Sequence, residues 1–102
     1  MKDRRQYFRI KNDGAIQASH EGFALKVIDM SSSGALVIKN DHILPEKGEL
    51  ILTTNNNSMK MHYEILKIGK EYMTLIFIQK NEIDTLFWIL KELKDNRLDW
   101  RQ

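Results

Sequence analysis

The sequence predicts a mainly β protein: a six-stranded antiparallel β-barrel followed by a C-terminal α-helix. Six short segments rich in strand-forming residues are separated by turn signals, and the last segment of the chain changes to helical spacing. The length of 102 residues suffices for one modest core. We therefore expect a single domain over 1–102, with a flexible basic segment at 1–12, the barrel at 13–80 and the helix at 81–96.

The first half of the chain supplies three of the expected strands, at 14–19, 23–28 and 35–38. The segment between the last two contains Ser and Gly, which favour a turn. In the second strand, alternate apolar residues are expected to share one face: Phe23, Leu25 and Val27.

The second half supplies three more strands, at 49–53, 59–66 and 72–78, after a loop marked by Pro45 and Gly48. The segment 72–78 is almost continuously apolar, which is typical of a central strand that is fully covered or packed under a helix. In the segment 59–66, alternate residues are expected to share a face: Met59, Met61, Tyr63 and Ile65.

The last segment has the pattern of an amphipathic helix, with Asn81 as its expected N-cap and an end near Lys94. Its apolar residues recur at helical spacing: Ile83, Leu86, Phe87, Leu90 and Leu93. Trp88 and Ile89 extend the apolar surface around the helix. They are either buried in this domain or part of an exposed patch for self-association or for a target protein.

Composition excludes several classes of function. The net charge of +2 is too small for a general nucleic-acid binder, and no apolar run reaches the ~20 residues of a transmembrane helix. The chain has no cysteine and its first residues lack the apolar region of a secretory signal, so we expect a cytoplasmic protein without membrane insertion.

No catalytic or metal-binding constellation stands out in the sequence. The three histidines, His20, His42 and His62, fall on different elements and have no metal-ligand spacing. The run Ser31-Ser32-Ser33 lacks the context of a nucleophile elbow. We expect a binding protein, with no enzymatic activity, no cofactor and no metal.

Two short motifs indicate what is bound. The first eleven residues carry five cations against the single anion Asp3, which forms a local anion-binding segment. Within this segment Arg5 and Arg9 have R-x-x-x-R spacing. After nineteen intervening residues, Asp29, Ser31 and Gly34 follow as D-x-S-x-x-G. This two-part pattern resembles the PilZ domain, a bacterial receptor module for the second messenger cyclic di-GMP.

The resemblance spans nearly the whole chain. It implies a six-stranded barrel and a cyclic di-GMP site made of Arg4, Arg5, Arg9, Asp29, Ser31 and Gly34. These residue types suit the ligand, because a guanidinium can donate two parallel hydrogen bonds to a phosphate or to guanine O6 and N7. A carboxylate can accept from guanine N1 and N2, and a serine hydroxyl can donate and accept. Gly34 would allow a positive φ or a close backbone approach beside the ligand.

The resemblance also suggests a stoichiometry and a mechanism. Arginine immediately before the R-x-x-x-R pair, here Arg4, is associated in PilZ domains with an intercalated dimer of cyclic di-GMP, so we expect two ligands per chain. We expect the ligand to order the N-terminal arginine segment onto the barrel and so to signal to a downstream protein in motility or biofilm regulation.

Two alternatives remain open. A PilZ-fold adaptor would bind proteins and no nucleotide, but such adaptors usually lose the motif residues that this chain retains. A small RNA-binding barrel would need aromatic side chains interleaved with basic residues on an open sheet face. Here most aromatic residues fall in apolar strands or in the helix, which disfavours that function.

Overall fold

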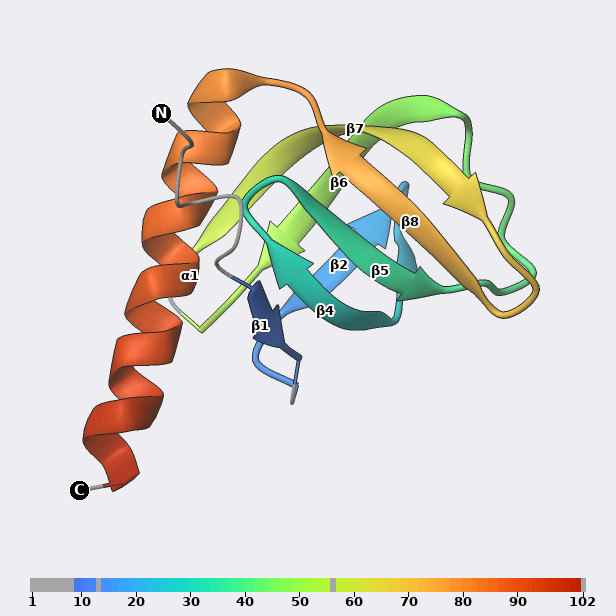
Figure 1. The fold of residues 1–102 in the computed structure, drawn as a ribbon. Helices are drawn as coiled ribbons and strands as arrows, with labels where there is room; N and C mark the ends of the chain where they lie inside the picture. Colours follow the sequence, from blue (N-terminus) through green and yellow to red (C-terminus); the bar gives the residue numbers. More distant parts are fainter. Residues whose placement is uncertain (1–8, 13, 56, 102) are drawn as a thin grey trace.

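The structure, a computed structural model, describes residues 9–12, 14–55 and 57–101, with side chains as far as residue 95. It confirms a mainly β fold with one C-terminal helix (Figure 1). The elements are β1 (Arg9–Lys11), β2 (Gln17–His20), β3 (Phe23–Leu25), β4 (Val27–Ser31), β5 (Gly34–Ile38), β6 (Lys47–Thr53), β7 (Ser58–Ile68), β8 (Tyr72–Phe77) and α1 (Lys80–Arg101).

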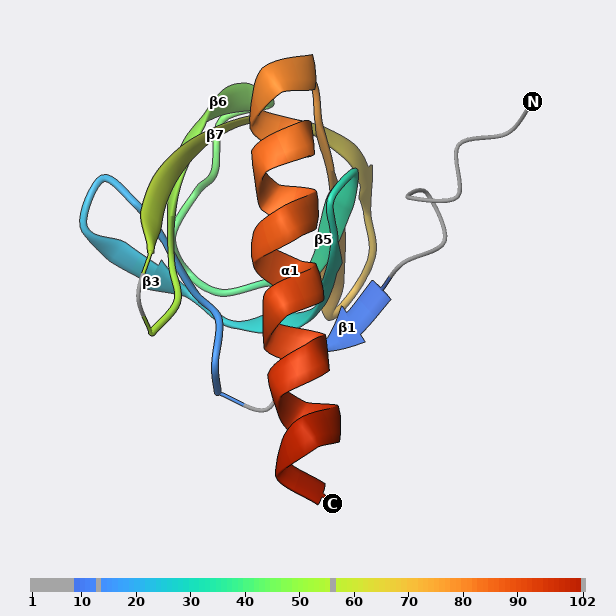
Figure 2. The same cartoon turned by 90° about the vertical axis from the view of Figure 1, so that its left-hand side faces the viewer.

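In the described part of the chain, eight strands form one antiparallel sheet in the order β1-β4-β5-β8-β7-β6-β2-β3. The sheet curls round, as the view along its axis shows (Figure 2). Only Lys26 separates β3 from β4, so the two are halves of one bent strand. Because β3 pairs with β2 and β4 pairs with β5, this bent strand joins the far ends of the β2-to-β5 sheet.

The expected count of six strands is wrong for two reasons. The sequence predicts one strand over 23–28, but the strand breaks at Lys26, and the register of β4 shifts between Val27 and Asp29. Residues 9–11, expected in a flexible segment, form β1 and pair with β4. The sequence indicates neither feature. The bend does not disturb the alternation of apolar residues in 23–28, and β1 contains a single apolar residue, which is too little for a strand pattern.

The core fills the inside of the curled sheet. On β7 the expected alternation is confirmed, since Met61 and Tyr63 are fully buried and Met59 and Ile65 pack partly against the core. Of the two alternatives expected for the segment 72–78, full cover of both faces is wrong for β8. This strand lies centrally, between β5 and β7, but its residues alternate between buried and accessible, so only one of its faces is covered.

Tyr63 is the largest fully buried side chain, and its hydroxyl donates a hydrogen bond to the carbonyl oxygen of Pro45 at 2.7 Å. Burial, with a smaller contribution from the negative charge of Glu21, raises the pKa of Tyr63 above its ordinary value. The folded protein therefore holds this proton more tightly than the unfolded chain. The stability that the neutral phenol contributes is present below pH ~10 and is lost as the pH rises through the raised pKa.

We expect Tyr63→Phe to lower the free energy of unfolding by about 1 kcal/mol at pH 8, through loss of the hydrogen bond. Above pH ~10 the variant should lose less stability than the parent, because it has no buried phenol to ionise. Urea unfolding at pH 8 and pH 10.5 measures both effects. The control is Tyr72→Phe, at a tyrosine that is 44% exposed. Parallel losses for parent and Tyr63→Phe at high pH would contradict this account.

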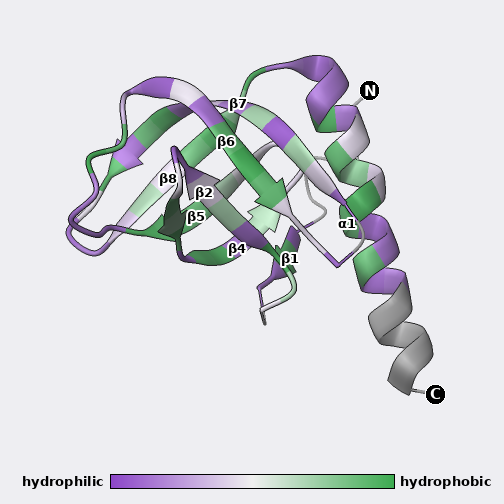
Figure 3. Cartoon of the chain, turned by 180° about the vertical axis from the view of Figure 1, so that it is seen from behind, coloured by the Kyte–Doolittle hydropathy of each residue, from purple (hydrophilic) through white to green (hydrophobic). Residues whose placement is uncertain are grey.

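Helix α1 runs along one side of the sheet, and its C-terminal part extends past the strands (Figures 1 and 2). It begins at Lys80, so Asn81 lies inside the first turn and is not the N-cap, and it continues to Arg101 beyond the expected end. Leu86 and Leu90 are buried against the barrel, with hydrophobic and hydrophilic residues alternating along the helix (Figure 3). None of the described residues form a helix long and apolar enough to cross a bilayer.

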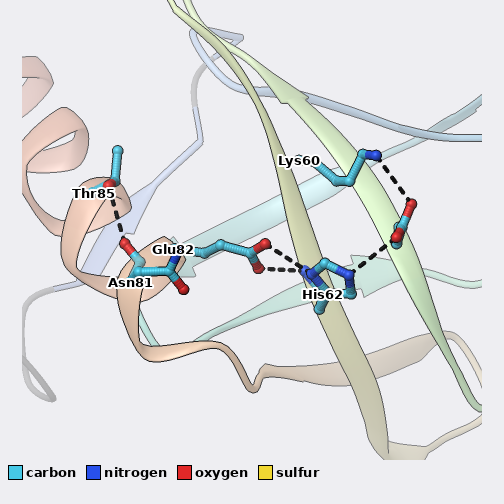
Figure 4. Close-up of polar contacts among 6 residues, drawn as sticks. Lys60, His62, Asn81, Glu82 and Thr85 are labelled. Carbon is cyan, nitrogen blue, oxygen red and sulfur yellow. Dashed lines mark hydrogen bonds and ion pairs between the residues drawn. The ribbon is translucent and has the colours of Figure 1, made fainter.

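A polar cluster attaches the first turn of α1 to the sheet (Figure 4). Glu82 accepts hydrogen bonds from the backbone N–H of His62, at 2.8 Å, and lies 2.8 Å from its Nδ1. On the other side, His62 Nε2 lies 3.0 Å from a Glu49 carboxylate oxygen, and Lys60 reaches the second oxygen at 3.5 Å. The cluster thus joins β6, β7 and α1.

Candidate functional site

The pairing of β1 with β4 brings the two sequence motifs together. Arg9 lies opposite Ser31 and Lys11 lies opposite Asp29 in the antiparallel register. Between them, Ile10 pairs with Met30, and both of these side chains point into the core. Because side chains alternate along a strand, Arg9 from one motif and Asp29 and Ser31 from the other share the opposite face.

Arg9 and Asp29 form an ion pair on this face, between the Nη1 group and the Oδ1 oxygen. The two side chains are 50% and 21% exposed, so the pair is accessible to a solute. One N–H of the guanidinium serves Asp29, whereas a guanidinium carries five, and a carboxylate has further lone pairs. The pair can therefore persist while both groups bind another molecule.

Ser31 is fully buried, and its hydroxyl belongs to the turn that follows β4. It accepts a hydrogen bond from the Ser33 backbone N–H at 3.2 Å and lies 3.0 Å from the Ser33 hydroxyl. Such serine contacts to the backbone two residues on stabilise turns. In this structure Ser31 therefore shapes the turn beside Asp29, and a ligand would meet Ser33 more readily, since Ser33 is only partly buried.

Gly34 opens β5 directly after that turn. Its φ is not positive, so the left-handed conformation is not the reason for glycine. A close backbone approach is the reason, but the neighbour is β8. A Cβ at this position would lie far inside van der Waals contact with the Leu75 carbonyl oxygen and 3.4 Å from the Ile76 Cα. Gly34 thus lets β5 and β8 pair closely beneath the turn.

Arg4 and Arg5 lie outside the described residues. Two described residues near the site were missed by sequence reasoning, Asn12 and Ser33. The triplet Asn12-Asp13-Gly14 carries a turn signal that marks the end of β1. No signal singles out Ser33 from its two serine neighbours.

Two of the three histidines, His20 and His42, are in contact although they lie 22 residues apart in the chain. His20 Nδ1 and His42 Nε2 lie 2.8 Å apart, so one nitrogen donates to the other, and Phe23 stacks on His42 with ring centroids 4.3 Å apart. Phe23, expected to share one face with Leu25 and Val27, is 57% exposed, whereas those two residues are buried. Within the residues that the structure describes, no three acidic or histidine side chains gather as metal ligands.

Comparison with known proteins assigns this arrangement to a family. Residues 9–98 match the PilZ-like family, described as PilZ domain-like. The solved structure of the Legionella protein Lpg0364 is similar with a TM-score of 0.87 and 36% sequence identity, over 89% of this chain and 98% of that chain. No curated protein matches the sequence.

Two further solved structures share the fold at low identity. The PilZ domain of CeSA from a cellulose-synthesizing bacterium has a TM-score of 0.58 at 14% identity, over 85% of this chain and 98% of that chain. The Bacillus subtilis inhibitor of motility, MotI/DgrA, has a TM-score of 0.60 at 19% identity, over 93% of this chain and 53% of that chain. The protein described above is thus a member of the PilZ domain-like family, whose domains act as cyclic di-GMP receptors or as adaptors.

Proposed function

We propose that this protein is a receptor for cyclic di-GMP. The observation that carries the proposal is the β1–β4 register, which sets Arg9 and Asp29 side by side on an accessible face. The two halves of the family's ligand motif, twenty residues apart in the chain, thereby lie within one hydrogen bond of each other. Membership of the PilZ domain-like family supports the same function.

The chemistry of the pair suits a guanine nucleotide. Arg9 can donate to guanine O6 and N7 or to a phosphate, and Asp29 can accept from guanine N1 and N2 through its remaining lone pairs. Ser33 offers a partly buried hydroxyl beside them, and Gly34 keeps the turn close to β8. A donor and an acceptor at this spacing distinguish guanine from a simple anion, which needs donors alone.

The arginines that precede β1 complete the proposal. Arg4 and Arg5 would close over the ligand from the N-terminal side, and Arg4 would provide the extra cation that an intercalated dimer with four phosphates requires. The signal would pass to an unidentified downstream protein in the cytoplasm. Trp88, 63% exposed on α1, offers an apolar contact for such a partner or for a second copy.

Isothermal titration of the purified chain with cyclic di-GMP tests the proposal. We expect about two ligands per chain, with GTP showing no comparable binding. The Arg5→Ala, Arg9→Ala double variant should bind at least tenfold more weakly, because each charge-assisted hydrogen bond contributes about 1.5–3 kcal/mol. Lys70→Ala, which removes an exposed cation from the β7–β8 turn, is the matched control and should bind as the parent does.

The outcomes separate the parts of the proposal. One ligand per chain would keep the receptor function and remove the dimer and the role of Arg4. Equal weakening by Lys70→Ala would indicate general attraction of an anion instead of a site. The absence of binding would favour the second candidate, a PilZ-fold adaptor.

A further inference from the structure

The strand pairing along one edge of the bent β3–β4 strand is interrupted near Arg9 and the D-x-S-x-x-G motif. β1 pairs with β4 as far as Lys11 and Asp29, whereas β2 pairs with β3 on the same side of the bent strand. Between β1 and β2, the described residues 14–16 form an arc outside the strand pairing, near the bend at Lys26. A three-residue strand that pairs on one edge alone is prone to fraying, so something must hold β1 in place.

The side chain of Asn12 bridges this interruption. Its Nδ2 group donates to the carbonyl oxygens of Ile16, at 2.9 Å, and Val27, at 3.0 Å. Its Oδ1 accepts from the backbone N–H groups of Gly14 and Ile16, both at 3.0 Å. The Asn12 backbone N–H continues the β1–β4 ladder with a hydrogen bond of 2.9 Å to the Ile28 carbonyl oxygen. The residue therefore ties β1, the arc and β4 together.

The side chain uses its full hydrogen-bonding capacity at this position. An amide has two N–H donors and an oxygen with two lone pairs, and all four are engaged with backbone groups. An aspartate would lose both donors and face two carbonyl oxygens with a negative charge. A serine has one donor and a shorter reach. Neither residue could make all four of these hydrogen bonds.

We infer that Asn12 is the positioning residue of the cyclic di-GMP site, an inference that rests on the proposed function. Asn12 would act through Arg9, three residues before it, by fixing the register of β1 on β4. A slip of one residue would turn Arg9 toward the core and Ile10 toward solvent, because side chains alternate along a strand. Correct register keeps Arg9 beside Asp29, where a nucleotide can meet both.

The variants Asn12→Ala and Asn12→Asp test this role. Asn12→Ala removes all four side-chain hydrogen bonds. Asn12→Asp retains the acceptor for Gly14 and Ile16, removes the donors to Ile16 and Val27, and adds a negative charge beside their carbonyl oxygens. The matched control is Asn40→Ala. Asn40 also bonds backbone groups through both ends of its amide, to Ala24 and His42, but in the β5–β6 connection. Should Asn12→Ala fail to fold, Asn12→Asp decides the question.

Three measurements are made on each variant: cyclic di-GMP affinity by titration, the same affinity in an Arg9→Ala background, and amide hydrogen exchange at residue 12. We expect both Asn12 variants to weaken binding by about tenfold or more, and Asn40→Ala to bind as the parent does. In the Arg9→Ala background the Asn12 substitutions should cause no further loss, because both act through the same guanidinium. Exchange at residue 12 should accelerate while amides of β6 and β7 stay protected.

Affinity within twofold of the parent, unchanged exchange at residue 12, or an independent further loss in the Arg9→Ala background would overturn the inference. The last outcome would show a general structural role without a connection to Arg9. A parent chain that binds no cyclic di-GMP would overturn the proposed function, and the ligand role of Asn12 with it. A parent that binds, with Asn12 variants that bind equally well, would overturn the role of Asn12 alone.

Discussion

Gly34→Ala is expected to lower the free energy of unfolding by about 3 kcal/mol, because the added methyl group meets backbone atoms of β8. The nearest atom is the carbonyl oxygen of Leu75, which lies in a central strand that pairs on both edges. A side chain could rotate away from the new methyl group, whereas this oxygen moves only if the β5–β8 ladder shifts. The cost therefore falls on the strand pairing itself.

Urea unfolding followed by circular dichroism measures this loss. Gly69→Ala is the control, since its added Cβ would lie 3.3 Å from the Tyr72 carbonyl oxygen in the β7–β8 turn, a tight contact that a small shift relieves. We expect this control to cost less than about 1 kcal/mol. Equal losses for the two variants would show that the close approach of β5 to β8 is not what requires glycine at position 34.

Leu90→Ala is expected to cost about 3 kcal/mol, through the transfer free energy of the lost methyl groups and the cavity that remains. Leu90 is fully buried between α1 and the barrel, and it lies one turn after the equally buried Leu86. The polar contacts of Glu82 attach only the first turn of the helix, so packing of these leucines holds the following turns.

Trp88→Ala on the same helix is the control, and it should change stability by less than about 1 kcal/mol because the indole is largely exposed. Both variants are compared with the parent by urea unfolding, with the helical signal at 222 nm followed separately. A large loss for Trp88→Ala would mean that its face is covered in solution. Size-exclusion chromatography would then show whether a second copy covers it, as self-association through α1 requires.

Sequence patterns predicted the fold class because the apolar alternation of the long strands is local information. The alternation in 59–66 marks the buried face of β7, with Met61 and Tyr63 inside. The same reasoning failed for 72–78, because an apolar run with little alternation does not reveal which face is covered. It also misplaced the start of α1 by one residue and its end by several, since end signals are weak.

The sequence names candidate site residues but does not predict how they are arranged. Arg9, Asp29, Ser31 and Gly34 follow from motif spacing alone. Their arrangement depends on β1, a three-residue strand with Ile10 as its one buried anchor, which no local pattern distinguishes from a tail. The structure also gives Ser31 and Gly34 roles within the protein. The Ser31 hydroxyl accepts a hydrogen bond in the turn, and Gly34 allows β5 to lie close to β8.

The bend at Lys26 has a consequence for how the chain can be cut. β3 and β4 are connected through the backbone of Lys26, whereas adjacent strands elsewhere in the described sheet are joined by hydrogen bonds between the strands. A circular permutant with new termini in the β6–β7 turn would keep the covalent connection between β3 and β4. New termini at Lys26 would leave the two halves of that strand to be aligned by noncovalent contacts: the pairing of β3 with β2, the pairing of β4 with β1 and β5, and the hydrogen bonds of Asn12 and Asn40. We therefore expect a chain break at Lys26 to destabilise the barrel more than a break in the β6–β7 turn.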